Sequence, residues 1–156
     1  MLFDRVPIGR VHLMLPGLGV ESCIRDYTRL LAAAPLDIVC LGIGVNGHLA
    51  FNDPPVADFT DPVDIEDGPA RPGLPPAAAR RWRLPRLEDV PRTALTLTIP
   101  RLLRSDRMFC VIPGPMKRDA VRRTLNDPIG EACPATALRT HPACTLYVDK
   151  DSLPEG

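Results

Sequence analysis

Residues 37–55 read DIVCLGIGVNGHLAFNDPP. After its first residue, the run 37–43 is continuously apolar and rich in β-branched side chains, which is typical of a buried strand covered on both faces of a sheet. Residues 94–99 and 108–112 have the same character, and shorter apolar runs at residues 11–15 and 145–148 also predict strands. The sequence therefore predicts several strands, most of them buried.

Helical patterns alternate with these strands. Residues 21–34 and 116–125 repeat their apolar side chains at helical spacing. Alternating strands and helices predict an α/β fold, with an open, largely parallel sheet and helices on both faces in a Rossmann-like three-layer arrangement. The length of 156 residues predicts a single domain over residues 1–156, in which the Pro- and Arg-rich residues 56–92 are irregular.

The glycines of residues 42–47 follow the first buried strand and fit the pattern G-x-G-x-x-G. One hypothesis is a dinucleotide site, with Asp64 or Glu66 as the acid that binds the ribose. A dinucleotide loop is followed by a full crossover helix, and Pro54 and Pro55 come too early to allow one. The dinucleotide hypothesis is therefore disfavoured.

Polar residues in the same stretch suggest a different site. Asn46, His48, Asn52 and Asp53 follow the strand, at the edge of an open α/β sheet where ligands bind. A carboxylate near an imidazole can fix its tautomer and raise its basicity, so His48 and Asp53 form a candidate acid–base pair. The alternative is structural: His48 caps a short helix and Asp53 forms a turn with Pro54.

Lys117 is a candidate anion ligand. It follows the strand at 108–112 and lies in the first turn of the next helix, where the helix N-terminus and the ammonium both favour an anion. The alternative is a solvated surface lysine. His12 and His141 are interpreted as structural residues.

Composition narrows the possible partners and compartment. The chain has 19 Lys and Arg and 19 Asp and Glu, which gives no electrostatic reason to expect nucleic acid or an anionic membrane as a partner. Its five cysteines form no C-x-x-C pair, which favours a reducing, cytoplasmic setting. We expect no signal peptide and no membrane span.

The stretch GIGVNGHLAFNDPP, residues 42–55, closely resembles the active-site signature of the glucosamine-6-phosphate deaminases. The 6-phosphogluconolactonases are a sister family with a similar glycine loop and histidine, but residues 49–54 fit the deaminases better. Further matches lie at residues 90–99, 110–121 and 138–149. The resemblance covers most of the chain except residues 63–88, and it implies the C-terminal part of that fold, truncated at the N-terminus.

The resemblance also implies roles for individual residues. His48 takes the place of the histidine that opens the sugar ring, Asp53 that of a supporting acid, and Asn46 that of a second acid, which here cannot ionise. Gly44 and Gly47 line the substrate, and Lys117 contacts its phosphate. A second phosphate-binding arginine is expected among residues 63–88, and neither Arg80 nor Arg81 is assigned to that role.

The implied reaction converts glucosamine 6-phosphate into fructose 6-phosphate and ammonia, in amino-sugar metabolism, with no metal or organic cofactor. The sugar phosphate is the expected partner, and a homo-oligomer is also considered. The family's N-terminal part carries the group that moves a proton between C2 and C1, and no residue here matches it. Two alternatives stay open: an inactive remnant that binds sugar phosphate, and a lactonase.

Overall fold

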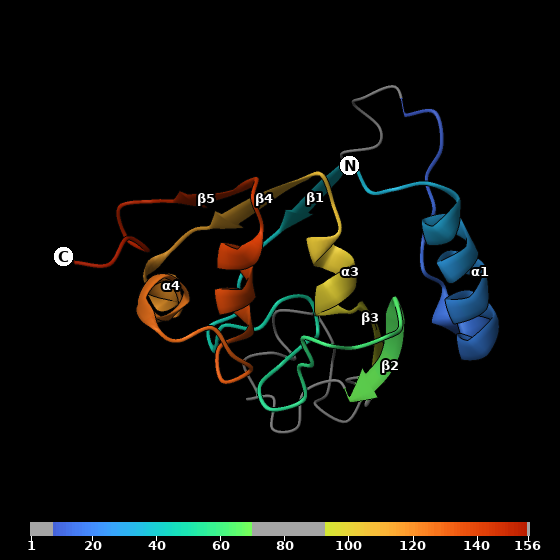
Figure 1. Cartoon of the computed structure of the whole chain (residues 1–156), viewed down its shortest axis with the longest axis horizontal. Helices are drawn as coiled ribbons and strands as arrows, with labels where there is room; N and C mark the ends of the chain where they lie inside the picture. The colour runs from blue at the N-terminus through green and yellow to red at the C-terminus, as the bar shows by residue number, and fades with distance from the viewer. Residues whose placement is uncertain (1–7, 70–92, 156) are drawn as a thin grey trace, which may run out of the picture.

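The computed structural model describes residues 8–69 and 93–155. Its centre is a parallel sheet of three strands in the order β1-β4-β5 (Figure 1). These strands are β1 (Ile38–Leu41), β4 (Arg107–Ile112) and β5 (Cys144–Val148). The sequence predicted all three as strands, and the α/β fold with an open, largely parallel sheet is confirmed.

Helices and a second sheet complete the described fold. The helices are η2 (Pro16–Leu18), α1 (Val20–Ala33), α3 (Ile99–Leu103), η4 (Pro115–Lys117), α4 (Arg118–Asn126) and η5 (Pro134–Thr140). The second sheet is an antiparallel pair of β2 (Ile65–Pro69) and β3 (Thr93–Leu97). The two predicted helices correspond to α1 and to η4 with α4.

Two strand predictions need correction. Residues 11–15 form no strand; they lie beside α1, where the Tyr27 hydroxyl donates to the His12 carbonyl at 3.4 Å. A short apolar run that packs on a helix cannot be distinguished from a strand by its pattern alone.

The predicted strand at 94–99 ends early and does not join the parallel sheet. It becomes β3, which pairs with β2 from the segment predicted to be irregular, and residues 70–92 of that segment lie outside the described residues. The chain turns into α3 because Thr98 caps the helix: its side chain accepts a hydrogen bond from the Arg101 N–H at 3.4 Å. Pro100 in the first turn favours the same change.

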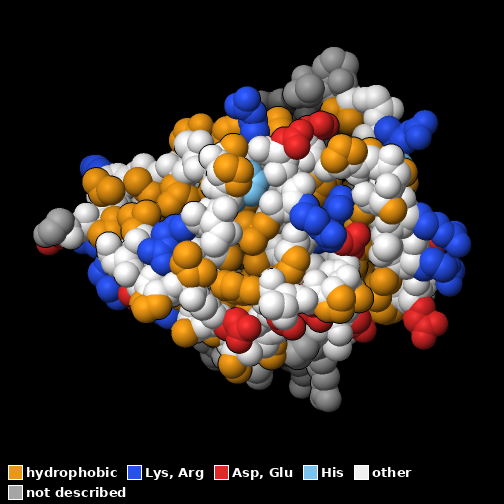
Figure 2. Space-filling model, in the orientation of Figure 1, with side chains coloured by type: hydrophobic (Ala, Val, Ile, Leu, Met, Phe, Trp, Pro, Cys, Tyr) orange, Lys and Arg blue, Asp and Glu red, His pale blue; other side chains and the backbone are white. Residues whose placement is uncertain are grey.

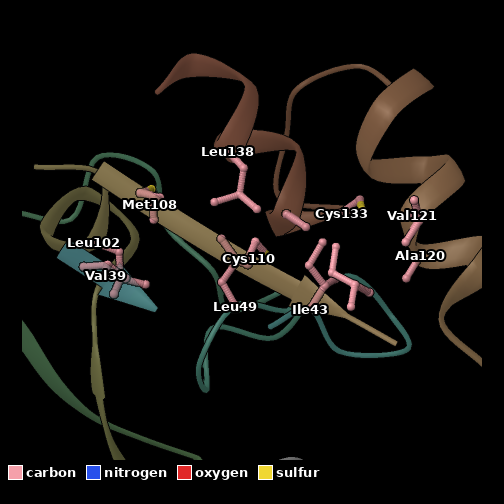
Figure 3. Packing of buried hydrophobic residues seen from close by; sticks show 12 residues of the cluster. Val39, Ile43, Leu49, Leu102, Met108, Cys110, Ala120, Val121, Cys133 and Leu138 are labelled. Atoms are coloured by element: carbon pink, nitrogen blue, oxygen red, sulfur yellow. The ribbon is translucent and has the colours of Figure 1, made fainter. Parts of the chain in front are cut away.

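The three-stranded sheet has one covered face. Side chains from the glycine-rich segment after β1, from α4 and from η5 converge on β4 in Figure 3. Buried on this face are Val39, Met108, Cys110 and Ile112, with at most 9% of their surface exposed. This packing places the carboxyl ends of β1 and β4 beside each other.

The opposite face of the sheet is apolar and open to solvent among the described residues. Ile38, Val111 and Tyr147 are each more than half exposed on it. Figure 2 shows apolar side chains gathered over the region of β5. The sequence predicted helices on both faces; in the described part of the chain, helices α3 and α4 lie on the covered side, below the sheet in Figure 1.

Candidate active site

A tight loop follows β1 at the carboxyl edge of the parallel sheet. We call residues 42–53 the glycine loop. Ile43 and Leu49 form an antiparallel bridge across it, and the Gly44 N–H donates to the His48 carbonyl at 2.9 Å. The Gly47 N–H donates to the Gly44 carbonyl at 3.0 Å. These bonds fold the loop back on itself, so that its polar side chains meet.

His48, Asn46 and Asp53 form a hydrogen-bonded chain. The Asn46 side-chain amide donates to Asp53 Oδ1 at 2.8 Å, and Asn46 Oδ1 lies 2.6 Å from His48 Nδ1. His48 Nδ1 is 3.5 Å from the same Asp53 oxygen. Because the Asn46 NH₂ group is on the carboxylate, its oxygen faces the imidazole, and Nδ1 must carry the proton that it donates. The arrangement fixes the tautomer of His48.

The chain of contacts is protected from water. The His48 and Asp53 side chains are 15% and 10% exposed. Hydrogen bonds are electrostatically stronger at such positions than in water. The arrangement can therefore hold an imidazole in one orientation for proton transfer.

Two glycines of the loop are required by close contacts. A Cβ placed on Gly44 would lie 1.7 Å from His48 Cε1 and Nδ1, so the imidazole occupies the space that any side chain at position 44 would need. Gly47 has a φ of +85°, and its Cβ would lie 2.5 Å from Cys133 Sγ. Both positions favour glycine, Gly44 for space and Gly47 also for its backbone conformation.

The second sheet supports the end of the glycine loop. The buried Asn52 side chain donates to the Leu49 carbonyl at 2.8 Å and to the Leu97 carbonyl of β3 at 2.9 Å. The Phe51 N–H donates to the Thr96 hydroxyl at 3.1 Å. The sequence did not predict this role of Thr96, since no local pattern connects residues 45 positions apart.

Lys117 lies at the same edge of the sheet as the glycine loop. It ends η4, and its ammonium donates a short hydrogen bond to the Ile43 carbonyl. The turn before it is held by the Gly114 N–H, which donates to Asp149 Oδ2 at 2.9 Å. Bonds from Ser152, Gly114 and Asp151 lower the pKa of Asp149, the backbone N–H of Ser152 contributing most. Lys117 thus brings a positive charge directly onto the glycine loop.

Cys110 lies under this edge but is not a candidate nucleophile. Burial raises the pKa of its thiol to about 12, with a contribution from Cys144, while Lys117 acts in the opposite direction. A thiol with so high a pKa stays protonated and unreactive near neutral pH. No group of His, Cys, Asp and Glu in the described residues could hold a metal ion.

The other candidates of the sequence analysis lie elsewhere. His141 is buried, with Nε2 2.7 Å from the Ser105 carbonyl, and Nδ1 accepts from the Ala143 N–H at 3.1 Å. Such contacts fit a structural residue. Arg80 and Arg81 lie outside the described residues. Residues 54–64, between the glycine loop and β2, form no helix, whereas a dinucleotide loop is followed directly by one.

In residues 8–69 and 93–155 no helix is both long and apolar enough to cross a membrane.

Known proteins are similar to this chain in sequence and in fold. The chain is 36% identical over 157 residues to a glucosamine-6-phosphate deaminase of Bacillus cytotoxicus, over 97% of this chain and 56% of that protein. A solved structure of a monomeric glucosamine-6-phosphate deaminase superposes with a TM-score of 0.71 and 32% identity, over 85% of this chain and 54% of the other.

A second solved structure shares the fold at lower sequence identity. The 6-phosphogluconolactonase of Thermotoga maritima superposes with a TM-score of 0.67 and 22% identity, over 94% of this chain and 59% of the other. At this identity the likeness concerns the fold alone. No family model matches the chain. The chain is therefore homologous over nearly its whole length to the glucosamine-6-phosphate deaminases, and it spans a little more than half the length of the curated relatives it matches.

Proposed function

We propose that this site opens the pyranose ring of a hexosamine 6-phosphate, as the first step in the conversion of glucosamine 6-phosphate to fructose 6-phosphate and ammonia. The observation that carries the proposal is the chain of contacts Asp53–Asn46–His48, part-buried at the carboxyl edge of the sheet and next to Lys117. Ring opening needs one well-oriented acid–base group, and this arrangement orients one.

His48 carries the proton in this proposal. As the bond between C1 and the ring oxygen breaks, the imidazolium gives the ring oxygen a proton from Nε2, and the C1 hydroxyl returns a proton to the same nitrogen. Both oxygens are bonded to C1, so one nitrogen can serve both. The products are the open-chain aldehyde and an unchanged His48. We assign the transfer to Nε2 because Nδ1 is engaged with Asn46.

Asn46 and Asp53 act behind the imidazole. Asn46 Oδ1 accepts a hydrogen bond from the Nδ1–H group and keeps the ring in one orientation, whereas Asp53 fixes the direction of the Asn46 amide. The sequence predicted Asp53 as the orienter of His48 and Asn46 as a polar support. The geometry instead favours Asn46 as the direct orienter of the imidazole and Asp53 as its support. Asn46 Oδ1 lies 2.6 Å from His48 Nδ1, whereas Asp53 Oδ1 lies 3.5 Å from it.

Lys117 binds the phosphate in this proposal. Its ammonium lies on the Ile43 carbonyl. A phosphate dianion is a much stronger acceptor for an ammonium than a neutral carbonyl is, so a sugar phosphate can take over this donor. Gly44 and Gly47 allow the sugar to approach the backbone closely.

The complete deaminase reaction needs a second proton transfer, from C2 to C1. None of the described residues near His48 is matched to that task, and the chain spans little more than half of its relatives. We therefore expect ring opening without efficient ammonia release from this chain alone. A cytoplasmic setting fits its five free cysteines.

A deaminase-type substrate is favoured over a lactone. The relatives above 30% identity are named as deaminases, whereas the lactonase structures share only the fold. Residues 49–54 also resemble the deaminase signature more closely than that of the lactonases.

The test measures ring opening directly. The purified chain is mixed with glucosamine 6-phosphate, and the exchange between the α and β anomers is followed by NMR, together with ammonia release. We expect faster anomer exchange with little ammonia, and a loss of about a hundredfold or more in the His48→Gln variant. His141→Gln is a poor control because His141 is buried; His12→Gln is the matched one.

Three results would contradict the proposal or part of it. If anomer exchange is no faster with the protein than without it, or equally fast in His48→Gln, His48 has no ring-opening role. Hydrolysis of 6-phosphogluconolactone in place of anomer exchange would favour the lactonase. Robust ammonia release would show that the chain carries a second base that we have not assigned.

A further inference from the structure

Arg123 of α4 contacts the glycine loop from 77 positions away. Its Nη1 donates to the Asn46 carbonyl at 3.4 Å, and its Nη2 donates to the Ala132 carbonyl at 2.7 Å. Its Nε donates to Asp127 Oδ2 at 3.2 Å. Each guanidinium nitrogen therefore has an oxygen partner, and the three partners come from three segments of the chain.

The guanidinium is itself held in place. Asp127, its carboxylate partner, follows α4, where Arg139 donates to the Asp127 carbonyl at 2.5 Å and to the Leu125 carbonyl at 2.7 Å. The Arg123 side chain is 25% exposed, against 50% for its neighbour Arg122. A rigid planar fork with three separate partners loses less entropy for each bond than a flexible lysine does.

The next peptide of the glycine loop is tied to the same support. The Gly47 carbonyl accepts from the Ala135 N–H at 2.8 Å, and Gly47 packs against Cys133. The carbonyls of Asn46 and Gly47 thus bond to partners from residues 118–135. Fixing both peptides fixes the backbone angles of Gly47, and the peptide between Asn46 and Gly47 also limits the rotation about the Cα–C bond of Asn46. The backbone that carries the Asn46 side chain is thereby restrained.

We propose that Arg123 is a positioning residue for His48, acting through Asn46. The role of His48 in ring opening rests on the proposed function. The effect of Arg123 on the geometry of the glycine loop does not. Without Arg123, the Asn46 peptide rotates more freely, and the Asn46 side chain holds His48 Nδ1 for a smaller fraction of the time.

The experiment compares variants at adjacent positions of α4. Arg123→Met keeps the length of the side chain and removes all three donors; Arg123→Lys keeps the charge but not the fork. Arg122→Lys is the control, because Arg122 pairs with Asp119 at 2.9 Å, lies 3.7 Å from Asp127 and keeps its charge in this variant. Two properties are measured by NMR without substrate: amide hydrogen exchange, and the tautomer of His48 from its ring nitrogen shifts.

We expect amide exchange at Gly47 and His48 to be about tenfold faster in Arg123→Met, with a smaller increase in Arg123→Lys, since hydrogen bonds to charged groups are worth about that factor or more. The His48 signals should move from one tautomer toward a mixture. Amide exchange in β4 should be unchanged in both Arg123 variants. In Arg122→Lys, amide exchange in the glycine loop and the tautomer of His48 should also be unchanged.

Three outcomes would overturn the inference. Unchanged exchange and tautomer in both Arg123 variants would show that the contact positions nothing. Equal acceleration in β4 would show a role in overall stability alone. The same effect in Arg122→Lys would show that it does not depend on the contacts of Arg123. Because no substrate is needed, these results do not depend on whether the ring-opening proposal holds.

Discussion

The loops that follow β1 and β4 lie at the same edge of one sheet and are built differently. The glycine loop is buried at Gly44, Gly47 and Asp53 and is held by bonds within itself and to β3, α4 and η5. The turn after β4, residues 113–117, which we call the lysine turn, is largely exposed, and Met116 has 78% of its surface in solvent. Its backbone is held by the turn bond from the Lys117 N–H to the Gly114 carbonyl and by the contact of Gly114 with Asp149, while the Lys117 ammonium donates to the Ile43 carbonyl.

The difference matches the chemistry proposed for each loop. A proton transfer depends steeply on distance and orientation, so His48 needs a rigid support. An ammonium that attracts a phosphate acts over a longer range and tolerates movement. Changes in the glycine loop should therefore affect catalysis, whereas changes in the lysine turn should affect affinity.

The largest effect is expected for Gly44→Ala. The new methyl group would overlap the His48 ring, so the imidazole must leave its place. A displacement of about 1 Å can cost a hundredfold in rate, and we expect at least that loss in anomer exchange. Gly130→Ala is the control, since a Cβ there meets no atom within 4 Å. A variant that keeps both the rate and the His48 NMR signals would contradict the close packing.

The next effect concerns Asn46→Ala. This change removes the oxygen that accepts the hydrogen bond from His48 Nδ1. The Asp53 carboxylate is then the remaining described partner, 3.5 Å from Nδ1. We expect anomer exchange to fall by about ten- to a hundredfold, with His48 in a mixture of tautomers. Val45→Ala, at the exposed neighbouring position, should have little effect. If Asp53 alone holds the ring, Asn46→Ala will keep the single tautomer.

In the lysine turn, Lys117→Ala should weaken the binding of glucosamine 6-phosphate by about tenfold, because one charge-assisted hydrogen bond is lost. The rate at saturating substrate should change little. Lys150→Ala, which removes the other lysine of the chain, is the control. Titration calorimetry at two salt concentrations checks the prediction. An unchanged affinity, or an equal loss in Lys150→Ala, would move the phosphate site elsewhere.

The smallest effect is expected for Asp149→Asn. An asparagine can keep the Oδ1 bonds to Asp151 and Ser152 but loses the acceptor for the Gly114 N–H. The lowered pKa of Asp149 means that the folded state binds its proton less tightly than the unfolded state does, so the carboxylate stabilises the fold above its ordinary pKa of 3.8. This contribution disappears as the pH falls through the lowered value.

The variant should therefore melt slightly below the wild type at pH 7, and the two should converge as the pH falls below the lowered pKa of Asp149. Thermal unfolding followed by circular dichroism measures this difference, with Asp151→Asn as the control. A gap that persists in acid would assign the effect to packing and not to the charge of Asp149.

Local patterns predicted most single elements. The apolar runs at β1, β4 and β5 and the helical spacing of α1 and α4 each correspond to an element of the structure. The polar cluster after β1 could also be predicted from the sequence, because residues 46–53 are close in sequence and a tight loop keeps them close in space. The pairing of β3 with β2 could not be predicted, since the same apolar run is compatible with a parallel or an antiparallel neighbour.

The sequence by itself determined the α/β fold, the glycine loop with His48, and the resemblance to the deaminases, because strand periodicity, glycine spacing and a short polar motif are local properties. Only the tertiary structure decided that Asn46 stands between Asp53 and His48, that Lys117 reaches the Ile43 carbonyl, and that Arg123 holds the loop from α4. It also decided that one sheet face is open among the described residues. These features depend on which distant segments meet, and that depends on packing of the whole chain.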